Sequence, residues 1–182
     1  MRSFQPSDYG LVLAKFLDTD RLRPLDEGTP VEQVHRDLAD LHLKSAFDHV
    51  DLADELNARC CLAGLWLLYD FLDESHTVSQ RIETIEGSFW HGMMHRREGD
   101  FSNAKYWFHK VGDHPVFEQM TGELDQLGGD LLGTRGVWDP FAFVDSCQSA
   151  IRTGDPAIDR CRQLQQREWE LLFDHCYHGA TS

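Results

Sequence analysis

Histidine side chains are concentrated in residues 88–115, a segment that holds four of the ten histidines and two of the five tryptophans. His91 and His95 lie four residues apart, so on a helix both rings would project from one face. Two imidazoles at this spacing can reach the same metal ion. Upstream, Asp73 and His76 are three residues apart and could supply further ligands. The spacing therefore suggests a divalent metal site with mixed nitrogen and oxygen ligands.

The same histidines also have a purely structural interpretation. The glutamate of the H-E-x-x-H zinc motif is missing, because Gly92 follows His91. Without that motif, His91 and His95 can equally be half-buried residues whose rings bond carboxylates or backbone carbonyls. Both interpretations stay open at the level of the sequence.

Three carboxylates, Asp70, Asp73 and Glu74, are expected at the C-terminal end of one long helix. The helix dipole already places partial negative charge there, so nearby cations should compensate. The candidate cations are Arg96, Arg97 and Lys105. Since a guanidinium can hold a carboxylate through two hydrogen bonds, an ion-pair network between two helices is predicted. The alternative is a pocket in which the same cations hold an anionic small molecule.

Two aromatic residues, Tyr106 and Trp107, fall outside the apolar stripe of their segment. Burial against a neighbouring helix is the usual outcome for side chains of this size, and it is our expectation here. The alternative is an aromatic wall beside a polar cleft that binds a small ligand.

Length, charge and cysteine usage narrow the function classes. A chain of 182 residues suits one domain, residues 1–182, and its net charge of −14 argues against nucleic-acid binding. Five cysteines without a C-x-x-C pair, and no leader peptide, predict a cytoplasmic protein. The longest apolar run, residues 60–69, is about half of what a bilayer-spanning helix needs. The expected partner is therefore a protein or a small molecule, with no membrane and no nucleic acid.

Helix start and stop signals recur along the chain and the alternation typical of strands does not, so the predicted fold is all-α. Residues 1–28 are expected to be peripheral or partly irregular, with a short helix over residues 9–17. Thr29 and Glu32 form a capping box around Pro30 and should begin the next helix. Residues 51–74 read as one buried central helix around which a compact multi-helix domain packs.

A helical hairpin is predicted between residues 89 and 115. Gly99 should stop its first helix and Asp100 should cap its second. Near the C-terminus, Asp139-Pro140 and Asp155-Pro156 each pair an N-cap with proline at the first helical position. With Gly154 as a helix stop between them, these signals predict a helix-turn-helix.

The hairpin resembles a single tetratricopeptide repeat unit of about 30 residues. The similarity is carried by small and aromatic residues at the family's spacings, namely Gly92, Gly99, Asp100, Phe101, Ala104 and Phe108. His91 and His95 stand where that family places two large apolar residues. Because no 34-residue repeat follows, the resemblance implies packing geometry and no peptide-binding superhelix.

Two segments, DESH at 73–76 and FWHGMMHRREGDFSNAKYWF at 89–108, resemble a family of uncharacterised bacterial proteins with related forms in fungi. The resemblance implies that the two segments form one unit. It brings no catalytic residue to this chain.

Three functions are compatible with these observations. The first is a non-catalytic helical protein that binds a protein or small-molecule partner through residues 73–115. The second is a metal-dependent enzyme whose metal, held by the three histidines with Asp73 or Glu74, activates a water molecule. The third is a metal-free enzyme or sensor for an anionic small molecule held by Arg96, Arg97 and Lys105.

Overall fold

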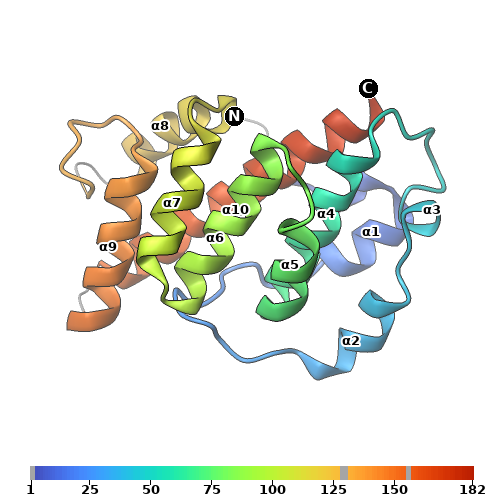
Figure 1. The fold of residues 1–182 in the computed structure, drawn as a ribbon, viewed down its shortest axis with the longest axis horizontal. Helices are drawn as coiled ribbons and strands as arrows, with labels where there is room; N and C mark the ends of the chain where they lie inside the picture. The colour runs from blue at the N-terminus through green and yellow to red at the C-terminus, as the bar shows by residue number, and fades with distance from the viewer. Residues whose placement is uncertain (1–2, 128–130, 155–156) are drawn as a thin grey trace.

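The computed structural model describes residues 3–127, 131–154 and 157–182. Over these residues it has ten α-helices, one short 3-10 helix and no strand, which confirms the all-α prediction (Figure 1). The elements are η1 (Pro6–Tyr9), α1 (Gly10–Leu17), α2 (Glu32–Ala39), α3 (Leu43–Ala46), α4 (Glu55–Leu68), α5 (Leu72–Ser79), α6 (Ile85–Glu98), α7 (Phe101–Val111), α8 (Pro115–Leu127), α9 (Pro140–Thr153) and α10 (Ile158–Thr181).

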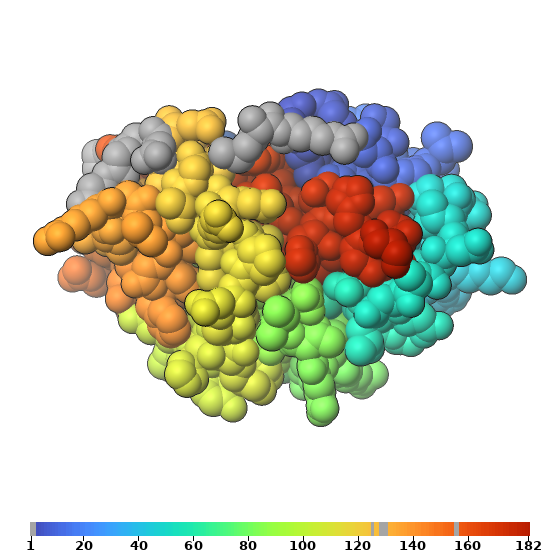
Figure 2. All heavy atoms as spheres, turned by 90° about the horizontal axis from the view of Figure 1, so that it is seen from above, coloured from blue at the N-terminus to red at the C-terminus, as the bar shows by residue number. Residues whose placement is uncertain are grey.

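The helices form a compact bundle in which α5, α6, α7 and α9 follow one another side by side, each in contact with the next (Figure 1). The long helix α10 crosses behind them and contacts α4, α8 and α9. Its C-terminal end reaches the surface between the N-terminal helices and the segments around α8 and α4 (Figure 2). Among the described residues, none of the helices is both long and apolar enough to cross a bilayer.

The predicted single helix over residues 51–74 is wrong, because the chain breaks at Asp70 into α4 and α5. Asp70 has φ of 64°, a left-handed conformation that is uncommon outside glycine. Its carboxylate is held by Arg97 at 2.6 Å and by Arg23. The break is therefore fixed by tertiary contacts that a local helix pattern does not reveal.

The break also overturns the predicted setting of the carboxylates. Asp73 and Glu74 lie in the first turn of α5, where the positive end of the helix dipole favours them. They do not crowd a helix C-terminus, so they create no demand for compensating cations. Of these three carboxylates, it is Asp70, at the break itself, that arginines hold.

Helix-end signals from the sequence succeed at some positions and fail at others. Asp139 caps α9 by accepting the backbone N–H of Phe141 at 2.8 Å, as predicted. The capping box at Thr29 is wrong, since α2 begins at Glu32 and no side chain caps it. Asp155 and Pro156 lie outside the described residues.

The predicted helical hairpin is formed by α6 and α7. Gly99 ends α6 with φ of 87°, and Asp100 caps α7 by accepting the Asn103 N–H at 3.1 Å. Gly92 packs against Phe108, whose ring carbons lie 3.3 Å from where a Cβ at Gly92 would stand. A small residue at Gly92 thus lets the two helices approach closely.

The N-terminal segment is partly irregular and is anchored on the core. Leu13, Leu17 and Leu25 are almost completely buried, although residues 18–31 contain no helix. The Tyr9 hydroxyl donates to Asp174 at 2.9 Å, and Arg21 pairs with Glu170 at 3.0 Å. Tyr9 and Arg21 therefore fasten this segment to α10.

Candidate functional site

Three histidines, His76, His91 and His95, come together between α5 and α6, and we call them the histidine cluster. Each offers a ring nitrogen, and these nitrogens all lie within 4.8 Å of one another. The rings are 4.6 to 5.4 Å apart between centroids. His91 and His95 project from one face of α6, as their spacing predicts, and α5 supplies His76. Moderate side-chain movement would bring all three nitrogens to the distances of one shared ion.

Burial keeps the two histidines of α6 neutral. His91 is 2% exposed and His95 is 5% exposed, whereas His76 is half-buried. Burial, with repulsion from His95, His76 and Lys110, lowers the pKa of His91 to about 3. Burial also lowers the pKa of His95, although Glu98 acts in the opposite direction. Both rings therefore carry an unprotonated nitrogen near neutral pH, which a metal ligand requires.

Hydrogen bonds indicate which nitrogen is free on each ring. The Ser79 hydroxyl donates to the His76 backbone carbonyl at 3.4 Å, so it accepts from His91 Nδ1 at 3.3 Å. His95 Nδ1 lies 3.2 Å from Glu98 Oε2, and a carboxylate can only accept. The protons are thus assigned to Nδ1 on both rings, which makes each Nε2 an acceptor. Metal-binding histidines are usually oriented in this way.

The second helix of the hairpin covers the cluster with polar and aromatic groups. The Asn103 amide nitrogen lies 3.0 Å from His95 Nε2 and satisfies that lone pair. Trp107 stacks on His91 with ring centroids 4.0 Å apart. Tyr106, in contrast, is 56% exposed, so its predicted burial is wrong. Trp107 is half-buried and packs on the histidine cluster through His91.

The two predicted carboxylate ligands do not join the cluster. Among the described residues, the potential ligands grouped with His76 are histidines alone. Asp73 is exposed, and Glu74 pairs with His35 at 3.2 Å. Both line an open acidic hollow of about 620 Å³. Glu98, which the sequence analysis missed, lines this hollow and also contacts His95, and its i, i+3 spacing to His95 was the available signal.

The three predicted cations pair with three different carboxylates. Arg97 binds Asp70 at 2.6 Å, which is one of the ion pairs that the sequence suggested. Arg96 instead binds Glu168 of α10 at 2.6 Å, with both side chains fully buried. Lys105 pairs with Asp145 at the surface. This arrangement gives no support to an anion pocket, because each charge is already compensated by a carboxylate.

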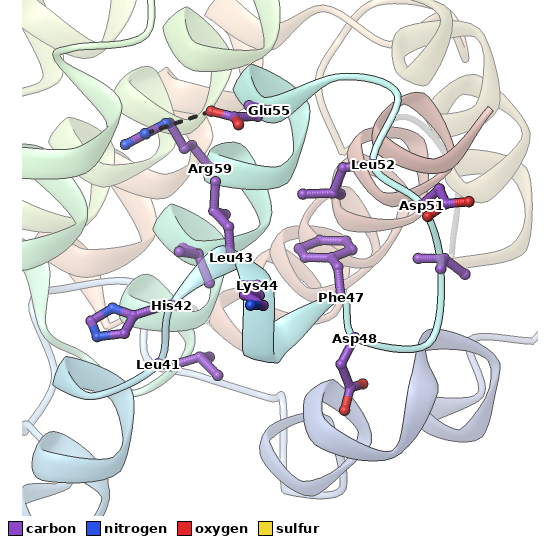
Figure 3. A pocket seen from close by; sticks show the side chains of 12 residues that line it. Leu41, His42, Leu43, Lys44, Phe47, Asp48, Asp51, Leu52, Glu55 and Arg59 are labelled. Carbon is purple, nitrogen blue, oxygen red and sulfur yellow. Dashed lines mark ion pairs between the residues drawn. The ribbon is translucent and has the colours of Figure 1, made fainter.

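An open groove of about 770 Å³ lies between α3 and the start of α4, outside the region singled out from the sequence. Figure 3 shows its apolar side chains, including Leu43, Phe47 and Leu52, with charged residues around them. Glu55 and Arg59 pair across one turn of α4 at its edge. The mixture of apolar and charged residues from 41 to 62 was the available signal for this groove.

No protein-family model, curated protein or solved structure matches this chain. The two resemblances drawn from the sequence therefore remain predictions. The functional argument depends on the geometry of the chain itself.

Proposed function

We propose that this protein binds a divalent transition-metal ion through His76, His91 and His95, with zinc as the best match. The observation that carries the proposal is the convergence of three ring nitrogens within 4.8 Å on two packed helices. Neutral imidazoles suit zinc, copper, nickel and iron, whereas magnesium and calcium prefer oxygen ligands. Two of the three rings are already neutral and oriented by Ser79 and Glu98.

A site of three histidines supports the metal-dependent interpretation over the non-catalytic one. Structural zinc sites use four protein ligands, whereas catalytic sites commonly use three and leave the fourth position to water or substrate. A zinc ion there would lower the pKa of a bound water to about 7. Glu98 would hold the ring of His95 in place through its contact with Nδ1.

Titration of chelator-treated protein, purified without a histidine tag, tests the proposal. We expect calorimetry to show about one tightly bound zinc ion per chain. Zinc should also raise the melting temperature of the protein. His76→Ala should abolish this tight binding with little damage to packing, because His76 is half-buried.

Two matched controls come from α7. His109→Ala removes an exposed histidine outside the cluster and should leave tight binding unchanged. Asn103→Ala removes a competing donor from His95 Nε2 without removing a ligand, so affinity should be retained or increased. Equal zinc affinity in wild type and His76→Ala would contradict the proposal, as would the absence of binding by zinc, cobalt and nickel in the wild type.

A further inference from the structure

A second group of potential metal ligands lies near the N-terminal end of α6, and we call it the Glu86 cluster. It consists of Glu86, His114 and His175, whose ligand atoms all lie within 4.8 Å of one another. His175 Nε2 is 3.5 Å from Glu86 Oε1, and the two imidazole rings are 4.7 Å apart between centroids. The cluster shares no residue with the histidine cluster. It joins α6, the connection before α8, and α10.

His114 has one ring nitrogen without a hydrogen bond. The residue is 5% exposed, and its Nδ1 accepts the backbone N–H of Val116 at 3.2 Å, at the start of α8. Its Nε2 is buried and has no hydrogen-bond partner among the described residues. Buried polar atoms are satisfied in the large majority of cases, so this unsatisfied nitrogen requires an explanation. A metal ion bound at Nε2, with the ring proton moved to Nδ1, would provide one.

The charge states at this cluster also suit a cation. Chiefly through its hydrogen bond to His175, the pKa of Glu86 is lowered to about 2, so the carboxylate is ionised. Burial, with repulsion from His175, lowers the pKa of His114 to about 4, so that ring is neutral near pH 7. An ionised carboxylate beside imidazole nitrogens is a ligand set found in zinc and iron sites.

From this geometry we propose that Glu86, His114 and His175 form a second divalent-metal site, of the type with two histidines and one carboxylate. The proposal is independent of the histidine cluster, since no ligand is shared. A metal at this position would tie together three segments that lie up to 89 residues apart in the sequence. Such a metal would join α6, the segment that leads into α8, and α10.

The proton positions predict that the Glu86 cluster binds metal more weakly than the histidine cluster. His91 and His95 already carry their protons on Nδ1, so metal binding there needs no proton transfer and only displaces the Asn103 amide from His95 Nε2. On His114 the neutral ring must carry its proton on Nε2, because Nδ1 accepts from Val116. When a metal takes Nε2, that proton has to move to Nδ1 through solvent, and the bond to Val116 is lost. The histidine cluster should therefore fill first.

Cobalt(II) titration of the full chain, followed by absorption and calorimetry, tests the second site. We expect two equivalents in the wild type, the second at least tenfold weaker than the first. Glu86→Gln and His175→Ala should each lose the weaker equivalent and keep the tighter one. His76→Ala should show the opposite pattern, so failure of either site is recognised separately.

A matched control and a second readout guard against misfolding and adventitious binding. Glu83→Gln removes an exposed carboxylate three residues away and should still bind two equivalents. In the wild type, hydrogen exchange of the Val116 amide should accelerate as the second equivalent binds, because its hydrogen bond to His114 is lost. The proposal is overturned if Glu86→Gln and His175→Ala still bind the weaker equivalent, if the wild type lacks it, or if exchange at Val116 does not change.

Discussion

The histidines and arginines of α6 are neighbours, but the arginines are charged and paired with carboxylates whereas the histidines are neutral. His95 and Arg96 are adjacent and both are buried, yet Arg96 is bound to a carboxylate at 2.6 Å while the His95 Nε2 lone pair meets only the amide of Asn103. Arg97 is likewise bound, to Asp70 and to three backbone carbonyls. Buried charge must be paired where it lies, whereas a neutral imidazole can be buried with a lone pair still available. On one helix, therefore, the arginines hold the fold and the histidines are available for a ligand.

Loss of the Arg96 charge should have the largest effect on stability. Arg96→Met leaves Glu168 fully buried without its cation, and breaking a buried pair from one side typically costs about 3–5 kcal/mol. Urea unfolding measures the change. Replacing both partners, as in Arg96→Met/Glu168→Leu, should recover most of the loss, because no charge is then stranded. A loss below about 1 kcal/mol in the single variant would show that the pair is not structural.

A substitution in the histidine cluster should abolish zinc binding and leave the apo fold nearly unaffected. His91→Phe keeps a flat ring for stacking on Trp107 and replaces a buried imidazole with an apolar side chain. Apo stability should change by less than about 1.5 kcal/mol. The stabilisation by zinc, about 2.7 kcal/mol at a concentration 100 times the Kd, should disappear. If zinc still stabilised His91→Phe, the proposed distinction between the arginines and the histidines of α6 would be contradicted.

Acid should destabilise the apo protein, because His91 has to be protonated. With a native pKa of about 3 against the usual 6.5, His91 binds fewer protons in the folded state than in the unfolded state between these values. The free energy of unfolding should therefore fall as the pH drops from about 6.5 toward 3, by up to about 1.4 kcal/mol per pH unit. Urea unfolding of chelated protein at pH 7 and pH 5 measures this slope. His91→Phe should flatten it, and an unchanged slope in that variant would exclude His91 as the source.

Local signals in the sequence were sufficient to predict the hairpin of α6 and α7. Gly99 and Asp100 fix its turn through their own backbone and cap, and the spacing of His91 and His95 places both rings on one helical face. His76 lies beside His91 and His95 because α5 packs on α6. The sequence suggested His76 only as a candidate further ligand.

Features that depend on distant partners could not be predicted from the sequence. The break at Asp70 needs Arg23 and Arg97, and the partner of Arg96 lies 72 residues away in α10. The Glu86 cluster was missed for the same reason, since His175 comes from the last helix. Spacing along one helix places His91 and His95 together, whereas the packed fold is needed to show that His175 meets Glu86 and His114.

The attachment of the N-terminal segment to α10 has a consequence for the order in which its contacts can form. Tyr9 and Arg21 precede their partners Asp174 and Glu170 by 165 and 149 residues. These two contacts can form only after α10 has been synthesised, whereas α1 can meet α3 earlier. Docking of the N-terminal segment on α10 thus reports that α10 is present, and a ribosome that stalls before α10 would leave Tyr9 and Arg21 without these partners.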